Sequence, residues 1–256
     1  MQYRCFLPLT LFLAVVLWST DVGRAQTTTD TSMASTLAQH AALDELCSIG
    51  RVRLGIYGGY TRANLYGDEL DFMFASQEAS WLPSFHAGLC VYSELQELFW
   101  LRHELFVNGR GALVQLRDSV QGLYSSALTS YYLDFAPISL TLHISGLQAY
   151  LGPYISALLT ATLQRKKSDG SIVLDESIFG DASNNESESR YLQKLDAGFY
   201  AGIEYAFPFG LTLGVRYIHG LIDIVQFANS YTLNHPKDDA IRIYNHAVMA
   251  SIGYRF

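Results

Sequence analysis

The sequence predicts an all-β protein: an eight-stranded antiparallel up-and-down barrel that spans a bacterial outer membrane. Two observations lead to this prediction. Half of the residues are hydrophobic, with 17 Tyr and 14 Phe, and only 16% are charged. After the first 25 residues, however, no stretch reaches the roughly 18 unbroken apolar residues of a transmembrane helix. From about residue 50 onward, apolar residues instead alternate with polar or small ones, as in strands with one apolar face.

Residues 1–25 have the features of a secretory signal peptide. Arg4 is the only charge of a short leading region, "FLPLTLFLAVVLW" is an apolar segment too short to span a bilayer, and small residues precede a cleavage site before Gln26. Cleavage removes a net charge of +1 and takes the chain from −7 to −8. An exported acidic chain argues against nucleic acid as a partner.

Residues 26–48 are expected to form a periplasmic extension, and residues 49–256 the barrel. The extension opens with polar residues and then places Leu43, Leu46 and Cys47 at helical spacing, which predicts a short helix. A plug that enters the barrel is an alternative for this segment.

Eight segments alternate in the barrel region. They are residues 51–62, 84–94, 98–110, 130–144, 147–164, 195–205, 211–217 and 245–256. Long separators at 63–83, 116–128, 165–190 and 226–240 take turns with short ones at 94–97, 145–146 and 207–210. Outer-membrane barrels have long outer loops and short periplasmic turns. The short turns and both termini are therefore expected to face the periplasm.

The fourth segment changes phase. Its apolar residues are odd-numbered up to Phe135 and even-numbered from Ile138 on. Since a one-residue slip would turn the apolar face around, one residue must be absorbed between them. Proline is tolerated in strands mainly at edges and bulges. We therefore expect a β-bulge at Ala136-Pro137.

The polar face of the strands carries ions of both signs, which predicts a narrow lumen filled by a mutually neutralising network. A soluble lipocalin-type barrel is the alternative, with the apolar face inside. The apolar face is almost free of charge, as lipid contact requires, and His103 is its mid-strand exception. The expected lumen residues are Arg51, Arg53, Arg102, Glu104, Arg110, Asp134, Asp196, Glu204 and Arg216.

The last segment keeps its apolar stripe up to the final residue of the chain, where most chains become polar and disordered. A lipid-facing last strand that closes on the first strand explains this, because closure removes both sheet edges. The stripe consists of Phe256, Tyr254, Ile252, Ala250 and Val248.

Several segments resemble the PorT-like outer-membrane β-barrel proteins. The fourth and fifth segments, "YYLDFAPISLTLHISGLQAYLGPYISALL", resemble the family's Y-L-x-(I/F)-P…G-P-Y hairpin, and "ELFWLRHELFVNGRGAL" and "DAGFYAGIEYAFPFGLTLGVRYIHGLIDI" resemble its third strand and its sixth and seventh strands. Two residues depart from the family pattern: Ala136 is inserted before the proline, and His103 stands where the third strand often carries proline. The resemblance implies that the C-terminal aromatic stripe is recognised by the barrel-assembly machinery. It also implies a link to type IX protein secretion through the family's namesake.

No motif for catalysis, a cofactor or a metal stands out, and we expect a non-enzymatic protein. His143 and Ser145 have the His-x-Ser spacing of lipid A deacylases, but they fall at a predicted periplasmic turn, on the wrong side for that chemistry. His86 is expected to belong to the polar filling of the lumen. The outer loops at 63–83 and 165–190 are solvated connectors or contacts for a partner or ligand.

Cys47 and Cys90 remain after cleavage of the signal peptide. If the first two strands meet near residues 62 and 84, the two cysteines are separated by about 30 Å at ~3.3 Å per residue. We therefore expect no disulfide.

The function expected from these features is that of a structural or accessory component of an envelope or protein-secretion complex. Its expected partners are outer-membrane lipid, the barrel-assembly machinery and secretion or envelope proteins. A barrel that binds a ligand or transports a small solute is the main alternative, although eight strands close around side chains without an aqueous channel. A lipid-modifying enzyme is a third hypothesis.

Overall fold

The computed structural model describes residues 52–67, 70, 79–118, 122–167, 169–174, 188–226 and 242–256. The predicted signal peptide (1–25), the predicted extension (26–48), Cys47 and Arg51 lie outside these ranges. No helix among the described residues is long and apolar enough to cross a membrane. The strands are β1 (Val52–Tyr66), β2 (Leu82–Glu94), β3 (Phe99–Asp118), β4 (Gly122–Ile144), β5 (Leu147–Lys166), β6 (Ile172–Leu174), β7 (Leu195–Ala206), β8 (Leu211–Gly220) and β9 (Tyr244–Arg255).

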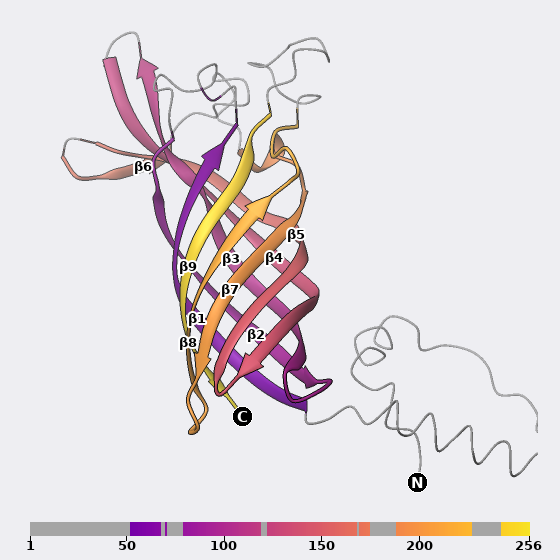
Figure 1. Cartoon of the computed structure of the whole chain (residues 1–256). Coiled ribbons are helices and arrows are strands. Elements are labelled where there is room, and N and C mark those ends of the chain that lie inside the picture. Colours follow the sequence, from indigo (N-terminus) through magenta and orange to yellow (C-terminus); the bar gives the residue numbers. More distant parts are fainter. Residues whose placement is uncertain are drawn as a thin grey trace, which may run out of the picture. The chain divides into compact units, whose positions relative to one another are not determined.

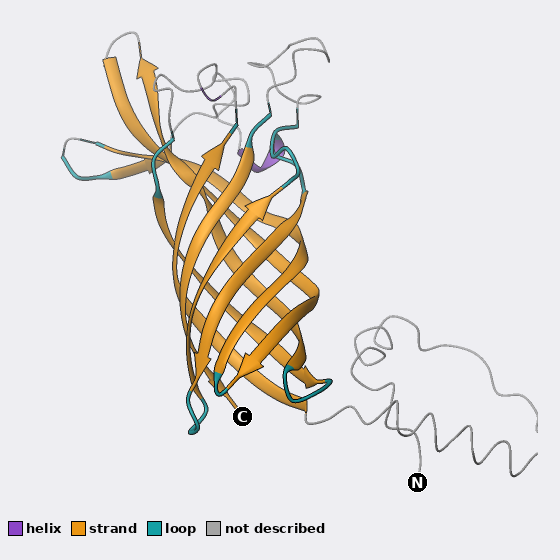
Figure 2. Ribbon diagram, viewed as in Figure 1, coloured by secondary structure: helices purple, strands orange, loops and turns teal. Residues whose placement is uncertain are grey.

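Eight of these strands form a closed antiparallel ring, which confirms the predicted fold class (Figures 1 and 2). Each of these strands pairs with its neighbours along the chain, with β5 pairing directly with β7. The ring closes where β1 pairs with β9, from Gly55 opposite Arg255 to Tyr66 opposite Tyr244. Closure leaves neither of these strands with an open edge along that length.

The two ends of the ring differ in their connections. The short connections 95–98, 145–146 and 207–210 lie at one end together with the C-terminus, as the lower part of Figure 1 shows. We call this the short-turn end and the opposite one the long-loop end. Gly146 and Gly210 lie in two of the short turns with φ of 91° and 97°, a backbone conformation that favours glycine.

The faces of the barrel are the reverse of those of a soluble barrel. Arg102 and Arg110 in the interior are 0% exposed, whereas Leu54 and Ile155 on the outside are 59% and 57% exposed. Since a lipocalin-type barrel places its apolar face inside, this distribution excludes that alternative. The outer face is the apolar surface that contact with lipid requires.

The bulge expected at Ala136-Pro137 is present. Arg102 pairs with Ser139 and Glu104 pairs with Ala136, so that two residues of β4, Pro137 and Ile138, stand opposite His103 alone. The apolar residues on both sides of the bulge consequently face outward, as the phase change predicted. The ring of His103 donates an Nδ1 hydrogen bond to the carbonyl oxygen of Pro137, and thereby provides a partner for a carbonyl that the bulge takes out of the ladder.

The alternation predicted for residues 147–164 is wrong beyond Leu158. Tyr131 pairs with Thr160 and Tyr132 with Leu158, so Leu159 is an extra residue of β5. This second bulge reverses the faces beyond it. Ala161 and Leu163 are odd-numbered like the outward-facing Leu151 and Ile155, so regular alternation predicts them on the lipid side, but they are 0% and 2% exposed.

The predicted long loop at 116–128 is also wrong for most of its length. β3 continues to Asp118 and β4 begins at Gly122, and they pair throughout, up to Asp118 opposite Gly122. The β2–β3 ladder, in contrast, ends at Asn108, and beyond it only an isolated bridge joins Ser80 to Leu113. The β3–β4 hairpin therefore rises past the other strands of the ring (Figure 1). The short strand β6, which pairs with the end of β5, was not predicted either.

An apolar cluster occupies the lumen near the long-loop end. It joins side chains of the strands to side chains of the connections that follow β1, precede β7 and follow β8. Its members include Leu65, Ala112, Val114, Leu128, Ala161, Leu163, Tyr191, Leu192, Ile224, Val225 and Ile243, each at most 4% exposed. Packed apolar side chains therefore fill this level of the barrel.

Candidate functional site

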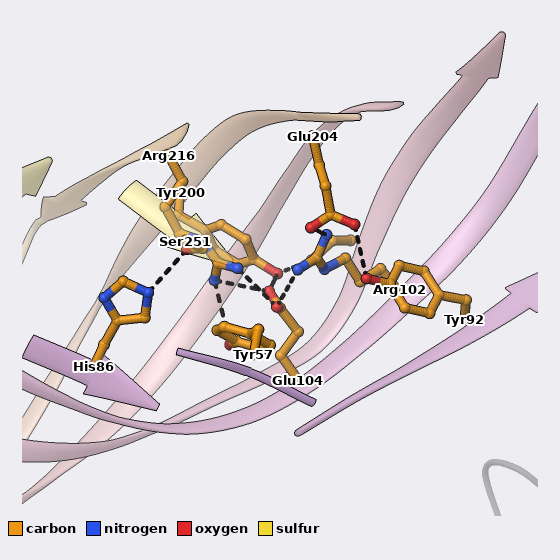
Figure 3. Close-up of polar contacts among 10 residues, drawn as sticks. Tyr57, His86, Tyr92, Arg102, Glu104, Tyr200, Glu204, Arg216 and Ser251 are labelled. Carbon is orange, nitrogen blue, oxygen red and sulfur yellow. Dashed lines mark hydrogen bonds and ion pairs between the residues drawn. The ribbon is translucent and has the colours of Figure 1, made fainter. Parts of the chain in front are cut away.

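Glu104 lies at the centre of the lumen and is shared by two arginines (Figure 3). Its Oε1 accepts hydrogen bonds from Arg102 Nη2 at 2.7 Å and from Arg216 Nη2 at 3.0 Å. Its Oε2 accepts from Arg216 Nη1 at 3.1 Å and from the Tyr200 hydroxyl at 2.6 Å. Four charge-assisted hydrogen bonds thus surround one carboxylate that is 2% exposed.

Glu204 completes this first network on the other side of Arg102. Its Oε2 accepts from Arg102 Nη1 at 2.9 Å, and its Oε1 accepts from the Tyr92 hydroxyl at 3.0 Å. The network then contains two arginines and two glutamates, and its charges balance. Buried charges need such pairing, because an unpaired ion costs several kcal/mol to desolvate.

Tyrosine rings enclose the two guanidinium groups of this network. Arg102 Cζ lies 4.4 Å from the centre of the Tyr150 ring, and Arg216 Cζ lies 4.8 Å from that of Tyr57. Tyr92 also lies within cation–π distance of Arg102, and Tyr200 within cation–π distance of Arg216. Rings and ions together occupy the middle of the lumen.

A second network surrounds Arg110, nearer the long-loop end. Its Nη1 donates to Asp196 Oδ2 at 2.6 Å and its Nη2 to Asp134 Oδ1 at 2.5 Å. Ser156 donates to Asp134, and Asn245 Nδ2 donates to Asp196 at 3.3 Å. One arginine here pairs with two carboxylates, and the neutral donors Ser156 and Asn245 supply further hydrogen bonds to them.

His86 belongs to a third group of lumen side chains, whose other members are the polar residues Thr61, Asn108 and Ser251. Its Nδ1 lies 2.9 Å from Thr61 Oγ1 and its Nε2 lies 2.8 Å from Ser251 Oγ. Thr61 in turn donates to Asn108 Oδ1 at 3.2 Å. The histidine therefore has both ring nitrogens occupied.

The structure brings seven of the nine expected lumen residues together in the two charged networks. Arg53 lies apart from them at the short-turn end, where it stacks on Trp100, and Arg51 lies outside the described residues. No tyrosine was included among the expected lumen residues. The tyrosines could have been recognised because they fall on the same alternating face of the strands as the charged residues. They are Tyr57, Tyr92, Tyr132, Tyr150, Tyr154 and Tyr200.

The arrangement offers rigidity rather than an accessible reactive group. Ser251 and His86 are at hydrogen-bond distance, as in a nucleophile–base pair. The group on the far side of His86 is the Thr61 hydroxyl rather than a carboxylate, however, and His86 is 2% exposed. Within the described ranges, no cluster of three or more His, Cys, Asp or Glu residues is placed to hold a metal ion.

Two further sequence features can be placed. His143 lies near the end of β4 and Ser145 lies in the turn between β4 and β5, both at the short-turn end, as expected. Cys90 has a free, buried thiol that faces the lumen. Cys47, with which no disulfide was expected, is not among the described residues.

The family model described as "Outer membrane protein beta-barrel domain" matches residues 25–226 of the chain. The chain belongs to this family. Membership agrees with the closed ring and its apolar outer face, and it places this outer-membrane β-barrel protein in the bacterial outer membrane. No curated protein matches the chain.

Solved outer-membrane proteins show a distant similarity to this family member. Neisserial surface protein A is 12% identical with a TM-score of 0.42, covering 81% of this chain and 100% of that one. Ail, the attachment invasion locus protein of Yersinia pestis, is 11% identical with a TM-score of 0.39 and the same coverage. OprG of Pseudomonas aeruginosa is 12% identical with a TM-score of 0.35, covering 80% and 95%. Similarities at this level carry no information on function.

Proposed function

We propose that the protein is a non-conducting, non-enzymatic barrel that serves as a structural or accessory component of an envelope or protein-secretion complex. The filled lumen is the observation that carries this proposal. The Glu104 network, the Arg110 network and the apolar cluster of the long-loop end occupy successive levels of one narrow barrel. A narrow barrel filled in this way offers no continuous path for a solute. Its role would then be to anchor a complex in the membrane and to present contact surfaces to the other components.

The orientation follows the general rule for this class of barrel. We propose that the short-turn end and both termini face the periplasm, and that the long-loop end faces outward. The C-terminal stripe of Phe256, Tyr254, Ile252, Ala250 and Val248 would then be the signal for the barrel-assembly machinery. The outward exposure of its large side chains, from 39% at Val248 to 69% at Phe256, supports this role.

The β3–β4 hairpin supports a contact role. The ladder between β2 and β3 ends at Asn108, and beyond it only an isolated bridge joins Ser80 to Leu113. The ladder between β4 and β5 ends at Ser126. Among the described residues, the hairpin tip beyond Leu113 and Ser126 therefore has two strand edges outside the ring ladders. Such edges pair readily with a strand of another protein.

The resemblance to PorT-like proteins favours secretion among the envelope processes. It rests on the hairpin sequence around "DFAPISLTLHISGLQAYLGPY" and on three further strands. The type IX-like assignment rests on this sequence resemblance, since a shared barrel fold alone does not determine a function.

Affinity purification from membranes in a mild detergent tests the proposal. With a tag in the short turn 207–210, we expect envelope proteins to co-purify with the barrel in a stable complex. A barrel that always migrates alone, after cross-linking in cells as well as after extraction, would contradict the accessory role.

A shortened hairpin provides the matched variant. Replacing residues 115–125 by Asn-Gly joins Val114 to Ser126, which face each other in the ladder, through a turn that suits a two-residue hairpin. We expect the ring to fold and the complex to be lost. The same operation on residues 167–171, at the β5–β6 hairpin, is the control, and there we expect the complex to persist.

A further inference from the structure

A pocket opens at the short-turn end of the barrel. It lies between the β4–β5 turn, the β7–β8 turn and the end of β9, and it has a volume of about 580 Å³. This falls within the range of about 300–1,000 Å³ of small-molecule sites. No residue of the charged lumen networks lines the pocket, and Arg255, which does line it, has its Cζ 5.7 Å from the centre of the Tyr92 ring of those networks.

Two arginines give the pocket its positive charge. The guanidinium carbons of Arg53 and Arg255 lie 5.2 Å and 5.6 Å from the centre of the Trp100 ring. The three lumen arginines all pair with carboxylates, but within the part of the chain that is described neither Arg53 nor Arg255 forms an ion pair. Glu94, which faces Trp100 in the ladder, pairs with neither.

Two buried donors at or near the pocket have no acceptor among the described residues. One is Nη1 of Arg255, which lines the pocket, and the other is Nε1 of Trp100, a side chain that is only 3% exposed and lies under the guanidinium groups of Arg53 and Arg255. His143, whose ring lies 4.7 Å from that of Trp100, lines the pocket as well. Because buried donors are normally satisfied, the two unpaired ones suit a ligand that accepts hydrogen bonds.

The opposite wall of the pocket is aromatic and continues onto the outer face of the barrel. Four of its rings are exposed there: Tyr205 at 42%, Tyr254 at 45%, Phe209 at 64% and Phe256 at 69%. Aromatic side chains at the end of a membrane barrel lie at the level of the lipid headgroups. The pocket thus joins a cationic site to the edge of the lipid layer.

We propose that this pocket binds the phosphate group of a phospholipid from the leaflet at the short-turn end. Arg53 and Arg255 would hold the phosphate oxygens, since guanidinium groups match phosphate in charge and geometry. The aromatic wall would contact the glycerol and the first part of the acyl chains. This inference goes beyond the proposed function and holds whether or not the barrel joins a complex.

Titration calorimetry of the exported protein in a non-ionic detergent tests the proposal. The phospholipid probe is dihexanoyl phosphatidylglycerol, the free-anion probe is inorganic phosphate, and dihexanoyl glycerol is the probe without phosphate. We expect saturable binding of the phospholipid, weaker binding of inorganic phosphate and no binding of dihexanoyl glycerol. Binding of inorganic phosphate without the phospholipid would overturn the lipid source, and binding of neither would overturn the site.

Variants assign the binding to the two arginines. We expect Arg53→Gln and Arg255→Gln each to weaken phospholipid binding at least tenfold. Arg62→Gln, an exposed arginine of β1 outside the pocket, is the matched control and is expected to bind as the unchanged protein does. A heat-dependent gel shift shows that each variant is folded, and Arg53→Gln carries the test if Arg255→Gln fails to assemble. Unchanged affinity in a folded Arg53→Gln variant would contradict the proposal.

Discussion

Arg216 and Glu104 form a two-bonded ion pair across the full width of the barrel, with Nη2–Oε1 and Nη1–Oε2 distances of 3.0 and 3.1 Å. They lie on β8 and β3, which are separated by three strands on either side of the ring. The pair therefore ties opposite walls together. The Arg102–Glu204 and Arg110–Asp196 pairs similarly join β3 to β7.

The change Glu104→Gln should destabilise the barrel. It keeps the shape of the side chain but leaves Arg102 and Arg216 with Glu204 as the only carboxylate of that network. Breaking a buried pair from one side costs about 3–5 kcal/mol. The free energy of unfolding in urea, measured in detergent micelles, should fall by this amount. Glu97→Gln in the exposed turn 95–98 is the control, and equal stabilities of the two variants would argue against the network.

The change His103→Leu tests the link between this histidine and the bulge. Without the ring, the part-buried carbonyl oxygen of Pro137 loses its donor, and a polar group left unsatisfied out of contact with water costs about 1–3 kcal/mol. We expect the same urea measurement to show this loss, and His103→Gln, which keeps a donor, to lose less. Equal losses for the two variants would show that the hydrogen bond does not support the bulge.

The change Gly59→Ala tests the closing seam. A Cβ at Gly59 would lie 1.9 Å from the backbone oxygen of Ala250 on β9, so the two strands would have to separate. Overpacking of this kind costs about 1–3 kcal/mol. We expect a smaller fraction of heat-modifiable barrel in membranes. Gly58→Ala, whose nearest contact is 3.3 Å, is the neighbouring control and should assemble. Full assembly of Gly59→Ala would mean that the seam is looser than the pairing indicates.

Removal of Phe256 tests the proposed assembly signal. The residue adds only one backbone hydrogen bond to the ring, from its N–H to the oxygen of Leu54. A large loss of inserted protein would therefore reflect recognition rather than folding. We expect the truncated chain to be exported and to remain mostly uninserted, whereas Phe256→Tyr should insert. Membrane fractionation followed by immunoblotting measures both, and normal insertion of the truncated chain would refute the signal.

The ring itself could be predicted from the sequence because lipid imposes strict alternation. Ile252 and Tyr254, for example, had to face outward if Ser251 and Gly253 faced inward. The phase change between Phe135 and Ile138 located the first bulge for the same reason. Arginines and carboxylates on the inward face likewise indicated a charged lumen.

The features that were missed lie where alternation no longer distinguishes the faces. At Leu158 and Leu159 both faces are apolar, so the second bulge left no phase signal. Ala161 and Leu163 then enter an apolar level of the lumen, where inward residues resemble outward ones. The β3–β4 hairpin was mistaken for a loop because its small and polar residues, such as Ser125 and Ser126, have no lipid to face. The hydrogen-bond partners within the lumen depend on which strands lie opposite, which only the closed ring defines.

If side chains fill the barrel, it anchors a complex in the membrane and conducts no ions. Single-channel recording of the heat-modifiable, folded protein in planar lipid bilayers tests whether the lumen is closed. We expect a current that does not exceed that of the protein-free bilayer. Regular conductance steps of uniform size from the same folded preparation would contradict it.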